Sequence, residues 1–358
     1  MSLSELYIRN ENFEILGIID DATSVIWTER YDECGDFEIY VRKTNKIMSI
    51  LRYKFVNFAC YVTRDDSKMV GFIEEITITT TEEQEQYVIF SGRCALGLLS
   101  RRVIANTEDF EDTSVNLILG KLITDNIVSA SIEARNINLL TCNSTISGTT
   151  SVSKISGNYF GQNLYECATE LCRTYDIGIR AVPVYSSQII YTIGEIEIQF
   201  YKGAERTGNS GTRPVIFSKE NDNLVESTYK DSTVKYMNAA LVLKSGETPS
   251  DLTTAFTGGA TGIHRGEIFT EIRTNVASQF LKETLIYRGK QELAKYKYMG
   301  EMEATASSGG TYEYRTHYNL GDRVVVDFGD GWLYFATVAE VTECLDETGY
   351  HLTPKLKY

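Results

Sequence analysis

The sequence predicts an α+β fold that is mainly β, in which two barrel-like β domains flank an α/β insert. Alternating apolar and polar residues, the pattern of half-buried strands, fill both ends of the chain, and turn sequences separate the runs. Helical spacing is confined to a few segments, the clearest of them in the middle. The chain has 358 residues, more than one hydrophobic core usually serves, so we expect three domains, over residues 1–105, 106–215 and 216–358.

Two segments, residues 24–41 near the start and 320–335 near the end, show the β pattern most clearly. Each combines two strand patterns with a tight Gly-Asp turn. Every second residue from Phe37 to Val41 is apolar, and residues 324–326 are all valine. Neither segment has the residue pattern of a nucleophilic, metal or phosphate site, so both are expected to be structural.

The first domain is expected to consist of short strands joined by turns. The predicted strands cover residues 5–8, 13–19, 25–31, 37–41, 54–63, 70–80 and 87–92. Clusters of Asn, Asp, Gly and Glu separate them, and only residues 46–51 and 95–99 have helical spacing. Strands at this spacing favour a small barrel or sandwich.

Two amphipathic helices are predicted in the insert. From Val115 to Ile123 the apolar residues recur at i, i+3, i+4, i+7 and i+8, which is one face of a helix. From Leu164 to Tyr175 they keep the same spacing, and Asn163 and Glu166 are placed like a capping pair at the helix start. Together with the strands that follow, these helices make residues 106–215 an α/β unit.

The remaining segments are assigned by the same patterns. Strands are expected over residues 177–184, 189–201, 228–244 and at the C-terminal end, loops over 143–161 and 245–262, and one long helix over about 275–298. Gly289 is a weak point of that helix. No repeat of short period is present, but the two β domains have similar sizes, which leaves a distant duplication open.

The residues that carry chemistry form no recognisable site. The seven cysteines are irregularly spaced and lack a CxxC motif, so we expect them to be reduced and mostly buried. The three histidines, His264, His317 and His351, have no metal-ligand spacing. The glycine-rich loops lack the lysine of a phosphate loop, and pairs of carboxylates follow from the acidic composition alone. We therefore expect no catalytic residues, no cofactor and no metal.

The charge of the chain argues against some partners. The 35 basic and 49 acidic residues give a formal net charge of −14, so specific nucleic-acid binding through a basic surface is not expected. The N-terminus has no basic leader followed by an apolar stretch, and no window reaches the ~18 apolar residues of a membrane helix. We expect a protein that is made in the cytoplasm and does not insert into membranes.

Seven residues are candidates for structural or interface roles. They are Trp27, Asp36, Arg93, Arg101, Arg102, Asp322 and Trp332. The three arginines bracket the apolar residues 96–99, where a guanidinium fork suits a carboxylate of another segment or subunit. The alternative is that they are exposed arginines with little energetic effect. The two tryptophans are either interface residues or core anchors.

Short motifs lie in order along nearly the whole chain. They are Trp27 with Arg30-Tyr31, Gly35-Asp36-Phe37-Glu38, Gly71-Phe-Ile-Glu74, Ser91-Gly-Arg93, Leu98-Leu99 with Arg101-Arg102, Asp222-Asn-Leu224, Tyr287-Arg-Gly289 and Leu320-Gly-Asp322. Their order and spacing resemble the siphophage tail-hub family, the tail-associated or baseplate-hub proteins of long-tailed phages and phage-tail-like particles.

The resemblance implies two barrel-like domains that pair within each subunit, and a homotrimer that forms a pseudo-sixfold ring. Such a ring continues the tail tube above, joins a spike, fibre or tip protein below, and leaves a lumen for DNA and the tape-measure protein. It implies a structural protein of the virion tail tip or baseplate, assembled in the host cytoplasm, and not an enzyme. A lumen lined with carboxylates would repel DNA phosphates, although the acidic balance is equally that of an ordinary soluble surface.

Two other function classes remain open. A carbohydrate-binding receptor module needs only aromatic platforms, and a cell-wall hydrolase needs a pair of carboxylates across a cleft. The chain ends at Tyr358, soon after the last predicted strands. Receptor contact, puncture or lysis is therefore expected to belong to another polypeptide.

Overall fold

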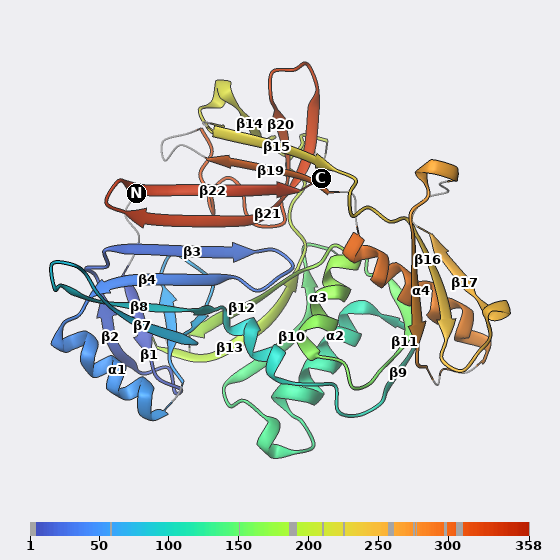
Figure 1. Ribbon diagram of the computed structural model, residues 1–358, viewed down its shortest axis with the longest axis horizontal. Coiled ribbons are helices and arrows are strands. Elements are labelled where there is room, and N and C mark those ends of the chain that lie inside the picture. Colours follow the sequence, from blue (N-terminus) through green and yellow to red (C-terminus); the bar gives the residue numbers. More distant parts are fainter. Residues whose placement is uncertain are drawn as a thin grey trace.

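A computed structural model describes residues 5–57, 59–149, 151–185, 192–209, 211–224, 226–256, 261–274, 276, 278–296, 299–305 and 311–357. The protein is mainly β with a few helices, as predicted (Figure 1). Two β units, built from the two ends of the chain, lie next to each other, and an α/β insert and a small side unit flank them.

The N-terminal β unit begins the chain. Its elements are β1 (Leu6–Arg9), β2 (Ile15–Ile19), β3 (Ser24–Arg30), β4 (Asp36–Arg42), α1 (Asn45–Asn57), β5 (Tyr61–Arg64), β6 (Gly71–Phe72), β7 (Glu75–Thr80), β8 (Gln86–Arg93) and η1 (Ala95–Arg101). The alternating apolar residues of β4, from Phe37 to Val41, are buried, as their spacing predicts. The strands β2-β1-β5-β6 form a separate sheet of four.

Residues 54–57 were predicted to begin a strand, and this prediction is wrong because they form the last turn of α1. Ile47, Ile50 and Leu51 of this helix are buried at helical spacing, and this packing favours a continuous helix as far as Asn57. The following strand, β5, begins only at Tyr61.

The insert contains both predicted helices. Its elements are β9 (Glu108–Ser114), α2 (Val115–Ile123), η2 (Thr124–Val128), η3 (Glu133–Arg135), β10 (Leu140–Ser147), β11 (Lys154–Tyr159), α3 (Leu164–Thr174), β12 (Gly178–Tyr185) and β13 (Ile193–Tyr201). Asn163 caps α3, since its side-chain oxygen accepts the backbone N–H groups of Tyr165 and Glu166. The predicted strand over 189–201 corresponds to β13, and residues 189–191 lie outside the described residues.

The stretch 143–161 was predicted to be a loop, and this prediction is wrong because it contains the end of β10 and all of β11. β10 pairs in parallel with β13, and β11 pairs with β9. Ile146, Ile155 and Tyr159 are buried. Burial of these few positions outweighs the polar composition of the segment.

The C-terminal part contains a β unit and the side unit. Its elements are β14 (Ile216–Ser218), η4 (Lys219–Asn221), β15 (Glu226–Ser232), β16 (Ala239–Lys244), η5 (Pro249–Asp251), β17 (Thr253–Phe256), η6 (Gly262–His264), β18 (Glu267–Ile272), α4 (Ser278–Leu293), η7 (Ala294–Tyr296), β19 (Met299–Thr305), β20 (Arg323–Asp327), β21 (Leu333–Asp346) and β22 (Gly349–Lys357). The helix predicted over 275–298 corresponds to α4. Residues 275, 277, 297 and 298 of the predicted range lie outside the described residues. The predicted strand over 228–244 is two strands, β15 and β16, which belong to different sheets.

The side unit consists of the sheet β17-β16-β18 and the helix α4, which packs on β16 and β17 (Figure 1). β17 lies inside the predicted loop 245–262, and residues 257–260 are outside the described part. Gly289 has a packing role here. A Cβ atom at this position would lie 2.7 Å from Cβ of Ala255 and 2.8 Å from Cγ2 of Val242, so the glycine lets the helix approach the sheet.

The two β units share one sheet of ten strands. Eight of them follow the order β15-β19-β22-β21-β3-β4-β8-β7, and β20 and β14 extend the sheet beside β21. No sheet in the described residues closes into a barrel, so the barrel-like domains that the sequence predicts take the form of an open sheet. The reason is that β3 pairs with β21 of the other unit, and this pairing makes one open sheet of the two units.

The strand order repeats across this sheet. The four main strands of the N-terminal unit are, in chain order, β3, β4, β7 and β8, and those of the C-terminal unit are β15, β19, β21 and β22. If the four strands of each unit are numbered in chain order, both units show the order third, fourth, second, first across the sheet. The N-terminal unit has β7-β8-β4-β3, and the C-terminal unit follows with β21-β22-β19-β15. All seven contacts are antiparallel, so the strand directions repeat as well. The two units are therefore arranged head to tail.

Three hydrophobic clusters hold these parts together. One cluster runs from the N-terminal β unit through the insert, a second fills the C-terminal β unit, and a third lies between α4 and its sheet. Since the first cluster is continuous, packing does not separate the two parts at residue 105. The boundaries at 105 and 215 stay predictions.

Candidate assembly site

β3 and β21 join the two β units, and we call their contact the seam. The strands pair from Arg30 opposite Glu340 to Val25 opposite Leu345. β3 lies in the first of the two segments that stand out in the sequence, and β21 begins in the second. Two distant parts of the chain thus meet in one ladder, and the polar groups beside it show how the units are held.

Two carboxylates occupy the inward side of the seam. Glu29 continues the core-facing row of Val25 and Trp27 in β3, and Glu343 lies opposite Trp27 in β21. The side chain of Glu343 is 2% exposed and that of Glu29 is 12% exposed. A buried carboxylate is costly unless cations and hydrogen-bond donors surround it.

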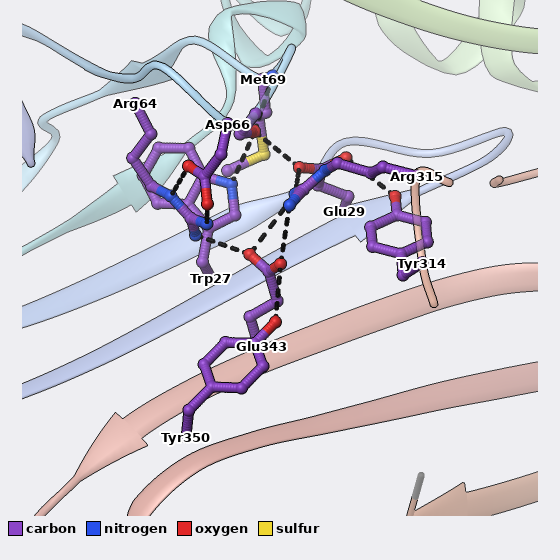
Figure 2. Close-up of polar contacts among 10 residues, drawn as sticks. Trp27, Glu29, Arg64, Asp66, Met69, Tyr314, Arg315, Glu343 and Tyr350 are labelled. Atoms are coloured by element: carbon purple, nitrogen blue, oxygen red, sulfur yellow. Dashed lines mark hydrogen bonds and ion pairs between the residues drawn. The ribbon is translucent and has the colours of Figure 1, made fainter. Parts of the chain in front are cut away.

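Two arginines supply the positive charge (Figure 2). Arg64, at the end of β5, is fully buried, and its Nη1 lies 2.6 Å from Glu343. Its Nη2 and Nε donate to Asp66 at 2.8 and 3.0 Å. Arg315, in the loop before β20, donates from Nη1 to Glu343 at 2.8 Å and from Nη2 to Glu29 at 2.7 Å. Glu343 therefore connects one arginine from each β unit.

Neutral donors complete this network, and we call Glu29, Arg64, Arg315 and Glu343 the seam cluster. The hydroxyl of Tyr314 donates to Glu29 at 3.1 Å, and that of Tyr350 donates to Glu343 at 3.0 Å. Ser67 donates to Glu29 at 2.6 Å. Each buried carboxylate thus has charged and neutral partners, which is what a stable buried ion pair requires.

The surroundings favour the charged forms of two groups of the cluster, Glu29 and Arg315. Burial alone would raise the pKa of Glu29, but Arg315 and the hydrogen bond from Ser67 outweigh burial and lower the pKa below its ordinary value. Burial would lower the pKa of Arg315, but Glu29 and Glu343 outweigh it and raise that pKa. Glu29 and Arg315 therefore form a charged pair across the seam at neutral pH.

Trp27 is the one candidate from the sequence that touches this cluster. It is fully buried, its Nε1 donates to Ser67 Oγ at 3.1 Å, and the guanidinium of Arg64 lies 5.2 Å from its ring centre. Trp27 is thus a core residue beneath the seam. Sequence reasoning missed the four charged residues, although Glu29 and Glu343 both interrupt core-facing rows of apolar residues, a signal that was available.

Asp36 lies on the other, solvent-facing side of the seam. It accepts from Arg30, which also donates to Glu340 of β21. Burial would lower the pKa of Arg30, but the two carboxylates outweigh it and raise the pKa. The two faces of the seam therefore both carry ion pairs that connect the β units.

The candidate arginines separate into two groups. Arg93 holds Glu74 through two parallel hydrogen bonds of 2.7 and 2.8 Å, and Arg101 donates to the same carboxylate at 3.2 Å. Arg93, then burial and Arg101, determine the pKa of Glu74, which is lowered to about 2. Arg102 points elsewhere and donates to the backbone carbonyl of Arg135 at 2.9 Å in the insert. The carboxylate that Arg93 and Arg101 bind is one of this chain.

Asp322 is a structural residue at the end of the insert. It is 3% exposed and accepts the backbone N–H groups of Ala204 at 2.7 Å and Asn319 at 3.0 Å. Nε of Arg206 lies 3.5 Å from Oδ2 of Asp322, the oxygen that accepts from Asn319. Asp322 thereby fixes the chain that leaves the insert to the start of β20.

Trp332 belongs to an exposed aromatic surface on the hairpin between β20 and β21. Trp332, Leu333 and Phe335 are 73%, 59% and 41% exposed. Behind them the rings of Phe328 and Tyr334 contact each other with centres 5.5 Å apart, and each lies 5.6 Å from the ring of Tyr229 in β15, in tilted or edge-on geometry. We call these six residues the aromatic hairpin surface, and it flanks the end of the sheet formed by β15. An exposed apolar surface of this kind is typical of a contact site.

The described residues contain no group of three or more His, Cys, Asp or Glu side chains placed to hold a metal ion. Nor does any helix among them have the length and apolar character needed to span a membrane. The described geometry joins two β units through an internal seam and leaves β7 and β15 at the ends of the shared sheet.

Comparison with known proteins agrees with this geometry. The fold is similar to that of the 43 kDa tail protein of prophage MuSo2 from Shewanella oneidensis, with a TM-score of 0.59, 13% identity and coverage of 99% of this chain and 98% of that one. It is also similar to a tail protein from Neisseria meningitidis, with a TM-score of 0.57, 12% identity and coverage of 99% and 96%. A third similar structure is the prophage tail protein gp18 from Listeria monocytogenes, with a TM-score of 0.55, 14% identity and coverage of 98% and 94%.

At these identities the structures establish the fold alone. No curated protein sequence matches the chain. The family comparison is more specific, because it matches the sequence itself from residue 5 to residue 356. The chain belongs to the siphovirus ReqiPepy6 Gp37-like family, a family of phage tail proteins, in agreement with the resemblance seen in its motifs.

Proposed function

We propose that this chain is a structural hub of a phage tail tip or baseplate: a homotrimer that joins the tail tube to distal spike, fibre or tip proteins. The repeated strand order carries the proposal. At the seam, the first strand of one unit, β3, pairs with the third strand of the other, β21. The two ends of the sheet are formed by strands equivalent to those of the seam: β15 is the first strand of its unit, like β3, and β7 is the third strand of its unit, like β21.

A second copy completes the same contact. β15 of one chain beside β7 of the next repeats the geometry of the seam, and the new contact is head to tail. Such contacts close into rings when the rotation between copies allows it. With two units in each chain, three chains give a ring of six units, which suits a sixfold tail tube.

The sheet ends support this pairing. Within the described residues β7 and β15 have a strand neighbour on one side only, and an exposed edge of this kind readily accepts another strand. Ile78 of β7 lies beside the buried Val88 on the core-facing side, yet it is 44% exposed. A neighbouring chain at this edge would cover Ile78 and meet the aromatic hairpin surface beside β15.

The solvent-facing side of the sheet suits a channel for DNA and the tape-measure protein. Glu38 of β4 and Glu75 of β7 flank Ser91 of β8 on this side. In the C-terminal unit, Lys355 lies opposite Glu340, so a cation balances the carboxylate there. Carboxylates along a lumen repel DNA phosphates, and we propose no specific binding of nucleic acid.

Light scattering of the purified protein tests the proposal. We expect a species of about three times the 40.3 kDa chain mass, alone or after addition of the tail-tube protein. A monomer that binds no other tail component would overturn the hub. Clearing of peptidoglycan that is lost on mutation of a carboxylate pair would point to a hydrolase instead. Binding of the monomer to host cell walls through Trp332 would favour the receptor module, for which the aromatic hairpin surface is the specific observation.

A further inference from the structure

Cys34 and Cys94 lie in direct contact. Cys34 is in the turn between β3 and β4, Cys94 follows β8, and their Sγ atoms are 2.9 Å apart. All seven cysteines are free, and among the described residues no other two have their sulfur atoms in contact. A disulfide bond is about 2.0 Å long, so a movement of about 1 Å would join the pair. We propose that Cys34 and Cys94 are a covalent modification site, at which a peroxide forms a reversible disulfide.

The backbone holds both residues in place for this bond. Asp36 and Arg93, which neighbour the turn and Cys94, are partners in the β4–β8 ladder. The N–H of Cys94 donates to the carbonyl of Gly35 at 2.7 Å. The N–H of Cys34 donates to the hydroxyl of Tyr165 at 2.9 Å. Ladder and hydrogen bonds fix the two backbones, so the bond forms without a rearrangement of the sheet.

Both thiols are largely buried, but a small oxidant has a path to them. Gly35, Cys94 and Leu96 line a cleft of about 790 Å³ between the N-terminal β unit, the insert and the C-terminal β unit. Cys34 is 8% exposed and Cys94 is 4% exposed. A peroxide is small enough to enter, whereas a bulky thiol reagent is hindered at the folded protein.

The surroundings make Cys94 the nucleophile. Burial alone would raise its pKa, but the hydrogen bond from the Cys34 thiol and those from the N–H groups of Leu96 and Gly97 outweigh burial and lower the pKa. The hydrogen bond that Cys34 donates, together with burial, raises the pKa of Cys34. The thiolate is the reactive form, so the first step occurs at Cys94.

The reaction balances with one peroxide. The Cys94 thiolate attacks one oxygen, the O–O bond breaks, and the departing hydroxide takes a proton to become water, which leaves a sulfenic acid. Cys34 sulfur then attacks the Cys94 sulfur, the S–O bond breaks, and the departing hydroxide takes the Cys34 proton. Two thiols are oxidised to one disulfide, and one peroxide is reduced to two waters.

That the disulfide forms after release of the particle rests on the proposed function, whereas the reaction of the two thiols with a peroxide is independent of it. A tail assembled in a cytoplasm meets a reducing medium, which keeps thiols free, and the released particle meets an oxidising one. The disulfide would join the β3–β4 turn to the start of η1, next to the seam. The N-terminal β unit would thereby be locked after release.

Mass spectrometry of the full-length protein tests the site. After treatment with hydrogen peroxide and quenching of free thiols in denaturant, we expect two of the seven thiols to be lost. Trypsin should then release the peptide of residues 31–42 linked to the peptide of residues 94–101, and a reductant should separate them. We also expect the melting temperature to rise by a few degrees on oxidation and to return on reduction.

Two variants make the result specific. Cys34→Ser should leave Cys94 as a sulfenic acid that dimedone labels once the protein is unfolded in denaturant, while Cys60→Ser, which removes another buried thiol, should leave the linked peptides unchanged. Oxidation of other cysteines before this pair, or a wild-type protein whose Cys94 accumulates as sulfenic acid without a link to Cys34, would overturn the proposal. A protein that forms the link but stays monomeric would contradict only the hub.

Discussion

Glu343 shows how one residue can hold two parts of a chain together. Its carboxylate forms ion pairs with an arginine of each β unit, Arg64 and Arg315, and its own side chain is almost free of solvent. The backbone hydrogen bonds between β3 and β21 can form in more than one register. The charged side chains, in contrast, must match in position. We infer that the seam cluster selects the register in which β3 and β21 pair.

Replacement of Glu343 by Ala should therefore be strongly destabilising. Arg64 and Arg315 would keep their charge in a buried site, and removal of one partner from a buried ion pair typically costs about 3–5 kcal/mol. Urea unfolding of the purified protein measures the change. The matched control is Glu347→Ala, in the exposed turn before β22, which should stay within about 0.5 kcal/mol. Equal stabilities of the two variants would contradict a structural role for the cluster.

The clamp on Glu74 predicts a dependence on pH. Its pKa is about 2 in the folded protein, below the ordinary value of 4.5, so the paired carboxylate adds stability above about pH 4.5 and loses it as the pH falls toward 2. Glu74→Gln should be less stable than the wild type at pH 7, by an amount on the order of 1 kcal/mol. The difference in unfolding free energy should disappear near pH 2. A constant difference over this range would show that Arg93 and Arg101 do not act through the charge.

At the level of elements, the sequence predicts what depends on local spacing. The stripes of α2 and α3 form within each helix, and the alternation in β4 forms within the strand, so all three are found correctly. β11 escapes prediction because only its pairing with β9 and a few buried positions make it a strand. The same holds for the site. Trp27 is recognisable by type, but the partners Arg30 and Glu340 are 310 residues apart in the sequence, and no local pattern joins them.

The side unit offers a test of helix packing. Gly289→Leu in α4 would place a large side chain where a single Cβ already meets Ala255 and Val242, and such overpacking costs about 1–3 kcal/mol. Lys282→Leu puts the same side chain on the exposed face of the helix and should have little effect. Hydrogen exchange should speed up in β16 and β17 for the first variant alone. Protection that is unchanged in both variants would contradict the role assigned to this glycine.

For the whole molecule, the repeated strand order turns an internal contact into a prediction about assembly. The seam joins a first strand to a third strand, and in the described part of the chain β15 and β7 are a first and a third strand that each lack a second neighbour. In a closed ring, β15 of every copy must therefore pair with β7 of the next copy. The two ends are different, so they can be blocked one at a time.

Ile78→Asp in β7 and Tyr229→Asp in β15 block one end each, at side chains that are 44% and 40% exposed. Each variant alone should form no ring, because every junction needs both an intact β7 and an intact β15. A mixture should give a dimer and nothing larger, since the intact β15 of the first variant meets the intact β7 of the second and the remaining ends are both blocked. Native mass spectrometry distinguishes these species, and Ile15→Asp, at an exposed isoleucine of β2, is the control that should still give trimers. Trimers from either end variant alone would mean that the subunits meet through another surface, and the head-to-tail ring would be wrong.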